Sequence, residues 1–192
     1  MIKDQIKASI EVKQRILEDQ ELLDQIQEVA ERCITAYQNG GKTLLAGNGG
    51  SAADAQHISA ELVNRFYFNR PGIPSIALTT DSSIMTSIGN DFGFDQLFSR
   101  QVEVQGNAGD LFIAISTSGN SVNLIEAVIK AKQKGLITVG LTGETGGKMA
   151  DQCDFCLKVP STETPRIQEA HILIGHIICY LIEKKLFGHL NR

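Results

Sequence analysis

The chain has 192 residues, of which 42% are hydrophobic and 21% are charged, and its formal net charge is −4. This length fits one domain with a single core, and the acidic balance excludes a general nucleic-acid binder, because there is no basic surplus to neutralise phosphates. The charged N-terminal segment lacks the apolar region of a signal peptide, and the apolar run 172–182 is too short to span a bilayer. We therefore expect one cytoplasmic domain over residues 1–192, without nucleic-acid or membrane partners.

Helical periodicity marks the first forty residues, where apolar side chains recur every three or four positions. Five short apolar runs follow and predict strands at residues 42–48, 75–80, 110–117, 137–143 and 155–160. Helical patterns separate most of these strands, at residues 51–66, 82–88 and 121–134. A last helix is expected with Thr164 as its N-cap and Pro165 at its first position, running to about residue 185.

The predicted strands are rich in Val, Ile and Leu and mostly continuous, as is typical of parallel strands that are buried on both faces. Their alternation with helices predicts an α/β fold, a three-layer α/β/α domain with a five-stranded parallel sheet and right-handed crossovers. The helical segments at the two ends fall outside this alternation. We expect them to cover the sheet or, for residues 1–40, to pack against other subunits.

Two turns of similar composition each join a predicted strand to a predicted helix. One is GNGGSAAD, residues 47–54, and the other is STSGNSVN, residues 116–123. Ligands of open parallel sheets bind at the carboxyl ends of the strands, glycine lets the backbone approach a ligand closely, and free amides at a helix N-terminus favour an anion. The two turns therefore predict an anion site, and the lack of a Rossmann or Walker A pattern argues against a nucleotide.

The second turn is the better candidate for phosphate, because it carries several hydroxyl donors. These belong to Ser116, Thr117, Ser118 and, at the expected N-cap of the next helix, Ser121. Ordinary turn chemistry is the alternative. In the first turn, Ser51 as an N-cap with Asp54 three residues later needs no ligand.

His57 and Glu61 lie four residues apart in a predicted helix and therefore share one face. An imidazole and a carboxylate at this spacing can bind a divalent metal or act as acid and base, with a surface ion pair as the alternative. The last helix adds Gln168, His171 and His176, although a histidine on an apolar stretch is often a satisfied core residue. Gln168 and His176 are eight residues apart, about 12 Å along a helix, so a site that uses both is expected to need two subunits.

Cys153 and Cys156 form a single C-x-x-C pair. Without a second pair, this spacing is weak support for a metal site. The segment is more simply interpreted as the start of a buried strand.

Five ordered motifs resemble those of the phosphoheptose isomerases, which are sugar-isomerase (SIS) domain proteins. The motifs, which lie within residues 1–187, are GNGGSAADAQHISAEL, IGNDFGFDQLFSRQ, ISTSGNSVN, LTGETGGKMA and RIQEAHILIGH. Members of this family convert sedoheptulose 7-phosphate to glycero-manno-heptose 7-phosphate. The resemblance implies a flavodoxin-like sheet, a cytoplasmic homotetramer with sites at subunit interfaces, one zinc ion per subunit, and a role in making the heptose of lipopolysaccharide or related surface glycans.

The resemblance also implies roles for individual residues. The implied zinc ligands are His57, Glu61, Gln168 and His176. The implied contacts to the sugar phosphate come from Asn48, Gly49, Gly50, Ser51, Glu61, Asn90, Asp91, Ser116, Thr117, Ser118, Ser121 and Gln168. Some members carry an Asp before the Arg-Ile-Gln of the last helix, where this chain has Pro165, so the role of that carboxylate is not transferred.

An aldose–ketose isomerisation needs a base, an acid and stabilisation of oxyanion charge. We expect Glu61 to be the base and His176 the acid, while zinc polarises the carbonyl. A zinc-bound carboxylate or imidazole is a poorer base, so ligand and acid–base roles remain open for both residues.

Two other functions fit the same fold. Related non-enzymatic proteins that bind the bacterial replication initiator lack the Glu and the second His, so the presence of Glu61 and His176 favours the isomerase. Phosphosugar-sensing regulators usually add a DNA-binding domain, and no such segment is visible in this sequence.

Overall fold

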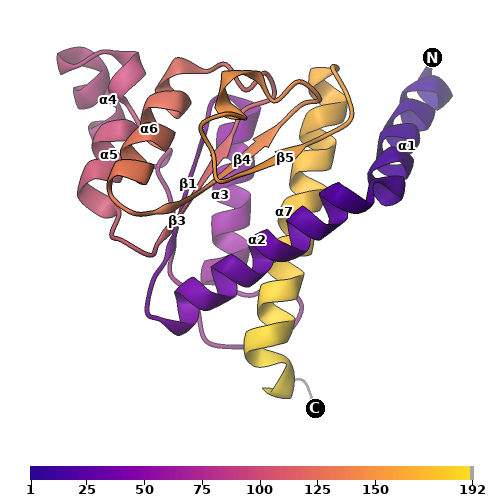
Figure 1. Cartoon of the computed structure of the whole chain (residues 1–192), viewed down its shortest axis with the longest axis horizontal. Helices are drawn as coiled ribbons and strands as arrows, with labels where there is room; N and C mark the ends of the chain where they lie inside the picture. Colours follow the sequence, from indigo (N-terminus) through magenta and orange to yellow (C-terminus); the bar gives the residue numbers. More distant parts are fainter. Residues whose placement is uncertain (191–192) are drawn as a thin grey trace.

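The structure is a computed structural model that describes residues 1–190 (Figure 1). Its centre is a five-stranded sheet of order β2-β1-β3-β4-β5, in which every neighbouring pair is parallel. The strands are β1 (Thr43–Gly47), β2 (Ser75–Ala77), β3 (Leu111–Ile115), β4 (Ile137–Thr142) and β5 (Phe155–Lys158). Each lies inside a predicted strand, and the order is that of flavodoxin-like folds, so the predicted fold class is confirmed.

Helices cover both faces of the sheet (Figure 1). They are α1 (Ile2–Glu18), α2 (Gln20–Gln38), α3 (Gly50–Val63), α4 (Ser82–Asp91), α5 (Ser99–Gln105), α6 (Val122–Gln133) and α7 (Thr164–Phe187), with short 3-10 turns η1 (Phe94–Gln96), η2 (Gly147–Met149) and η3 (Gly188–Leu190). The short helix α5 was not predicted, because seven residues offer too little periodicity to distinguish a helix from a loop.

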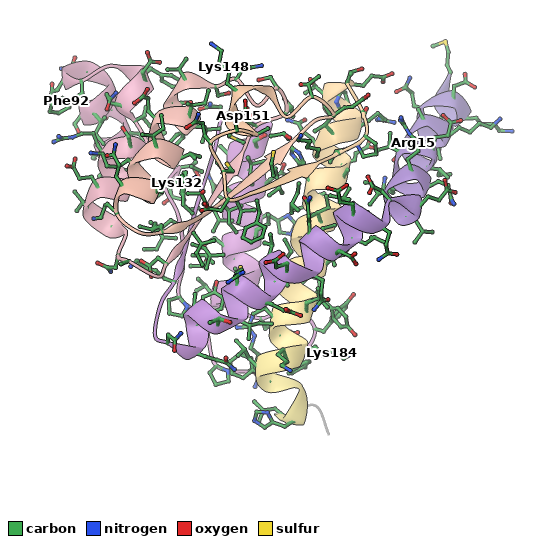
Figure 2. All side chains as sticks on the ribbon, viewed as in Figure 1. Arg15, Phe92, Lys132, Lys148, Asp151 and Lys184 are labelled. Atoms are coloured by element: carbon green, nitrogen blue, oxygen red, sulfur yellow. The ribbon has the colours of Figure 1, made fainter. Side chains whose placement is uncertain are left out.

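Alternate residues of the strands point to opposite faces and divide the core into two layers. In β3, Ile113 and Ile115 pack in one layer with α2, α3 and α7, whereas Phe112 and Ala114 pack in the other with α5 and α6. Charged side chains such as Arg15, Lys132 and Lys184 lie on the outside (Figure 2).

The two ends of the chain behave differently. Helix α7 lies against α2 and α3 and buries residues along its whole length, while α1 projects from the body of the molecule (Figure 1) and leaves Ile2, Ile6 and Ile10 exposed. The packing of α1 against another subunit remains a prediction. Within residues 1–190, no helix is both long and apolar enough to cross a membrane.

The start of α7 corrects one detail of the sequence analysis. Glu163, not Thr164, is the N-cap, so Thr164 is the first helical residue and Pro165 the second. Proline is tolerated there because its missing N–H has no intrahelical partner in the first turn.

Candidate functional site

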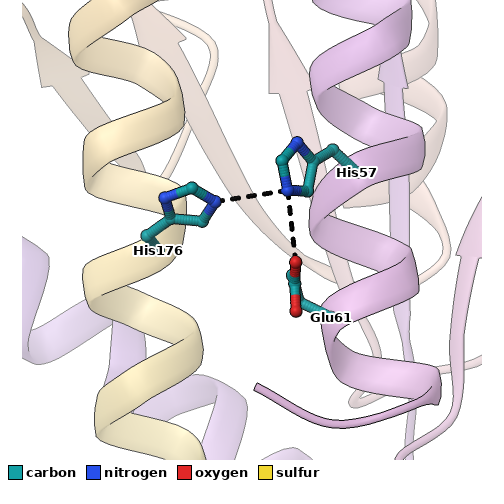
Figure 3. Close-up of side chains that lie close together, drawn as sticks. All are labelled: His57, Glu61 and His176. Carbon is teal, nitrogen blue, oxygen red and sulfur yellow. Dashed lines mark hydrogen bonds and ion pairs between the residues drawn. The ribbon is translucent and has the colours of Figure 1, made fainter. Parts of the chain in front are cut away.

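Three side chains from two helices converge beside the sheet (Figure 3). His57 and Glu61 lie on successive turns of α3, and His57 Nε2 is 3.2 Å from Glu61 Oε1. His176 reaches across from α7 and places its Nε2 3.4 Å from His57 Nε2. We call His57, Glu61 and His176 the histidine cluster.

A glycine brings the two helices together at this level. A Cβ atom added to Gly175 would lie 2.5 Å from Ile58 Cδ1, so any larger residue at this position would force Ile58 to move and disturb the observed approach of α7 to α3. Because Gly175 precedes His176 and Ile58 follows His57, this contact sets the two imidazoles opposite each other. A surface ion pair between His57 and Glu61 alone does not account for the third member of the cluster.

The cluster fits a divalent cation such as zinc. Its three candidate ligand atoms all lie within 4.8 Å of one another, and two imidazoles with one carboxylate form a donor set that zinc uses in catalytic sites, with a fourth position left open. Ligands about 2.1 Å from a tetrahedral zinc are about 3.4 Å from each other, close to the 3.2 and 3.4 Å separations found here. Two facing imidazole nitrogens also need a shared proton or cation to avoid lone-pair repulsion.

Gln168, the fourth predicted ligand, lies on α7 but away from the histidine cluster. A Cβ added to Gly50, at the start of α3, would lie 2.5 Å from Gln168 Nε2. The amide is therefore beside the first turn, about 12 Å along α7 from His176. The structure thus brings three of the four predicted ligands together within one chain, and a contribution of Gln168 from a neighbouring subunit remains a prediction.

The first turn presents bare backbone at the start of α3. Gly49 is the N-cap with φ 56° and offers no side-chain cap, so the alternative in which Ser51 caps the helix is wrong. Ser51 is buried under the turn, where a Cβ on Gly47 would lie 2.4 Å from its carbonyl oxygen. Asp54, the partner of Ser51 in that alternative, has a buried Oδ2 without a hydrogen bond.

The second turn is a tight loop lined by hydroxyls. Ser121 is the N-cap of α6 as predicted, and its Oγ lies 3.1 Å from Ser116 Oγ. Gly119 has φ +64°, and a Cβ there would lie 2.0 Å from the carbonyl oxygen of Gly146. The loop is therefore braced by the segment that follows β4, through a further bond in which Gly143 N–H donates to Thr117 O over 3.0 Å.

Paired amides join the two turns. Asn48 Nδ2 donates to Asn123 Oδ1, and Asn123 Nδ2 donates to Asn48 Oδ1, both over 3.0 Å. We call residues 47–51 and 116–121 together the turn edge. Asn90 and Asp91 lie at the exposed end of α4, where Asn90 Nδ2 donates to Asp91 Oδ1 over 2.7 Å. Among the described residues, no hydrogen bond joins that pair to the turn edge.

His171 lies on the buried side of α7 and is not a member of the histidine cluster. Its Nε2 lies 3.1 Å from Thr142 O at the end of β4, while its Nδ1 has no partner. Burial lowers the pKa of His171 to about 4, against a smaller opposite effect of the bond to Thr142. The histidine is therefore neutral near pH 7 and donates to the carbonyl.

The C-x-x-C pair lies at the start of a strand, as the sequence analysis predicted. Cys156 lies in β5 and Cys153 just before it, and both are free thiols. Burial raises the pKa of Cys153 to about 12 and also raises that of Cys156. Among residues 1–190, the histidine cluster is the one group of three or more His, Cys, Asp or Glu placed to hold a metal ion.

Two buried charged residues near the cluster helices were missed by the sequence analysis. Arg70 and Glu183 form a buried ion pair beside the C-terminal ends of α3 and α7. A glutamate within an apolar helix and an arginine before Pro71 were the available signals. Neither signal identifies the partner, because 113 residues separate the two.

Comparison with known proteins gives consistent matches. The SIS domain family matches residues 6–143. A phosphoheptose isomerase of Aneurinibacillus thermoaerophilus is 65% identical over 97% of this chain and 94% of its own length. A solved phosphoheptose isomerase from Francisella tularensis has a TM-score of 0.92 and 38% identity over 95% of this chain and 96% of its own. Another from Neisseria gonorrhoeae has a TM-score of 0.88 and 43% identity, over 96% of this chain and 100% of its own.

Proposed function

The chain belongs to the phosphoheptose isomerase family of SIS-domain proteins, and from this we propose that it is an isomerase that converts D-sedoheptulose 7-phosphate to D-glycero-D-manno-heptose 7-phosphate. One observation carries the proposal: His57, Glu61 and His176, which offer a base, an acid and a metal-binding set, converge in one place. The relatives supply the substrate class, and the turn edge supplies donors for its phosphate and hydroxyls.

The reaction moves one hydrogen between neighbouring carbons. In the open-chain ketose, Glu61 removes a proton from C1, and the electron pair of that bond forms the C1–C2 double bond of an enediol or enediolate. A proton from His176 is then delivered to C2, and the hydroxyl proton of O1 moves to O2, so that C1 becomes the aldehyde. General acid–base catalysis of this kind contributes roughly 100-fold to 10,000-fold.

His57, Glu61 and His176 are the residues that would hold a zinc ion, with Gln168 of a neighbouring subunit as the proposed fourth ligand. When bound, zinc supplies Lewis-acid polarisation of the carbonyl oxygen. A carboxylate that also serves as a ligand is a weaker base, so Glu61 acts best as a base when it faces the substrate.

The turn edge is proposed to bind the rest of the substrate. The phosphate is suited to the second turn, where hydroxyls and the backbone amides at the start of α6 can donate to its oxygens. The hydroxyls are those of Ser116, Thr117, Ser118 and Ser121. The hydroxyls and the carbonyl end of the sugar are then bound by the first turn, which comprises Asn48, Gly49, Gly50 and Ser51, with Gln168 beside it. Further contacts come from Asn90 and Asp91. Binding the remote phosphate helps to orient the reacting carbons.

The remaining proposals concern assembly and pathway. Within one chain, the histidine cluster lies about two helical turns beyond the start of α3. A homotetramer in which one subunit offers its turn edge to the cluster of another would complete the site, with the exposed α1 as an interface. We place this enzyme in the cytoplasm, at the first step towards nucleotide-activated heptose for lipopolysaccharide or other surface glycans.

The test is an isomerase assay on sedoheptulose 7-phosphate, with and without a chelator, together with metal analysis of the purified protein. We expect turnover that a chelator abolishes and zinc restores. No turnover with added zinc would instead favour a non-enzymatic protein that binds the replication initiator, or a phosphosugar-sensing module.

A further inference from the structure

Glu183, about two turns beyond His176 on α7, forms an ion pair with Arg70, which lies between α3 and β2. Arg70 Nε donates to Glu183 Oε1 over 3.0 Å, and both side chains are only 1% exposed. Two buried charges cost free energy unless each is paired and hydrogen-bonded on all sides. The further contacts of the pair therefore show which parts of the molecule it holds.

Arg70 closes the end of α3. Its Nη2 donates to Glu61 O over 2.8 Å, and its Nη1 donates to Leu62 O over 2.7 Å. The helix ends at Val63, and the last carbonyls of a helix have no intrahelical partners, so its last turn frays unless something caps it. Arg70 caps the turn that carries the Glu61 side chain, with its positive charge at the favourable end of the helix dipole.

Glu183 holds the loop that follows α3. Its Oε1 accepts from Phe66 N–H over 2.8 Å, and its Oε2 accepts from Tyr67 N–H over 2.7 Å. These bonds place the ring of Phe66 against that of His176, with 5.5 Å between the centroids. Burial by itself raises the pKa of Glu183, but the two amides and Arg70 outweigh it and hold the pKa below its usual value.

We propose that the Arg70–Glu183 pair is a positioning device that keeps Glu61 and His176 at the separation which a bound metal ion requires. The inference rests on the proposed metal-binding role of the histidine cluster. One partner of the pair fixes the turn of Glu61, and the other fixes the aromatic ring that packs on His176. Supporting partners of metal ligands change metal affinity by about 10-fold to 100-fold when they are removed.

A second ion pair provides a matched control. Lys42 Nζ lies 2.6 Å from Asp110 Oδ2, and their side chains are 19% and 3% exposed. Asp110 also accepts from the amides of Lys42 and Asn107 over 2.9 Å, so it is bonded much as Glu183 is. This pair joins the starts of β1 and β3, and among residues 1–190 none of its hydrogen bonds or ion pairs reaches the cluster, so its loss should destabilise the fold without changing the cluster.

The experiment compares Glu183→Gln with Asp110→Asn in the full chain. Zinc affinity is measured by competition with a chelating dye, and stability by urea unfolding of the metal-free protein. We expect Glu183→Gln to weaken zinc binding by about 10-fold or more and to lower kcat with little change in KM. Asp110→Asn should lose stability while its zinc affinity and kcat stay as in the wild type. Equal zinc affinities in the two variants would overturn the proposal.

An independent readout needs neither metal nor substrate. In the metal-free protein at fixed pH, the Cε1 proton signal of His176 is assigned from its loss in His176→Gln. Phe66→Leu should shift this signal because the aromatic ring is removed, and Glu183→Gln should shift it in the same direction because the ring is released. An unchanged signal in Glu183→Gln would overturn the proposal even if the protein shows no isomerase activity, which separates this test from that of the proposed function.

If Glu183→Gln does not fold, Arg70→Lys replaces it. Lysine keeps the charge opposite Glu183 but cannot donate to the carbonyls of Glu61 and Leu62 from the positions of a guanidinium fork. A weakened zinc affinity and a shifted His176 signal in this variant support the positioning role. Wild-type values for both measurements contradict it.

Discussion

The turn edge and the histidine cluster offer a substrate two different kinds of surface. The turn edge is backbone held rigid by glycines and by the Asn48–Asn123 amide pair, and it presents N–H and hydroxyl donors. The cluster consists of side chains from two helices, held in position by helix packing and by the Arg70–Glu183 pair. In the proposed function the turn edge binds the substrate and the cluster carries the chemistry, so substitutions in the two regions should affect KM and kcat differently.

The largest expected effect comes from Glu61→Gln. Glutamine keeps the shape of the side chain but cannot accept a proton, so kcat should fall by about 100-fold to 10,000-fold. The variant should still fold and bind the sugar phosphate, as measured by calorimetry. Glu28→Gln, a change to an exposed carboxylate of α2, serves as the control. Near-normal turnover of Glu61→Gln would remove Glu61 from the role of base.

His171 joins the helix of the cluster to the end of β4, and its effect should appear in stability. Its pKa of about 4 lies below the reference 6.5, so the unfolded chain takes up the proton first and stability falls as pH drops from 6.5 to 4. At 1.36 kcal/mol per pKa unit, the wild type should lose about 3 kcal/mol relative to His171→Gln over this range.

The measurement is urea unfolding at a series of pH values. His189→Gln, which changes an exposed histidine, should keep the wild-type slope. The same slope in His171→Gln would show that His171 does not cause the pH dependence.

Gly119→Ala should damage the turn edge alone. Its positive φ and the 2.0 Å approach to Gly146 O leave no room for a Cβ, so the loop must move and misplace its donors. Loss of one hydrogen bond to a charged group is worth about 1.5–3 kcal/mol, so KM should rise by about 10-fold or more while kcat changes little. Gly188→Ala, where the nearest atom is 4.0 Å away, is the control. A fall in kcat at unchanged KM would contradict the separation of binding from chemistry.

The smallest expected effect is that of Ser118→Ala. Ser118 Oγ accepts from Asn120 N–H over 3.1 Å and remains able to donate to a phosphate oxygen. Ser118 is exposed, so losing this single donor should cost only the roughly 0.5–1.5 kcal/mol of a typical hydrogen bond, which raises KM by about 3-fold to 10-fold with kcat nearly unchanged. The inhibition constant of inorganic phosphate should rise by the same factor. Unchanged values of both constants would argue against phosphate binding at this turn.

Most of the sheet could be predicted because its signals are local. Continuous apolar runs such as 110–117 already indicate a buried parallel strand, and all five runs became strands. The expected ends were less accurate, since capping depends on backbone geometry. Gly49 rather than Ser51 is the N-cap of α3, and Glu163 rather than Thr164 is the N-cap of α7. Helix α5 is too short to show a period, and tertiary packing of residues such as Val102 stabilises it.

The two turns and the spacing of His57 and Glu61 were visible in the sequence, because strand-end chemistry and helical faces are properties of neighbouring residues. The meeting of His57 with His176 follows from no local pattern, since 119 residues separate them; at the sequence level only the family resemblance implied it. Only the register between α3 and α7, set by the contact of Gly175 with Ile58, places the imidazoles together and Gln168 beside Gly50. The same register brings Glu183 to Arg70, because helix packing is decided by side-chain volumes from distant segments that no local pattern records.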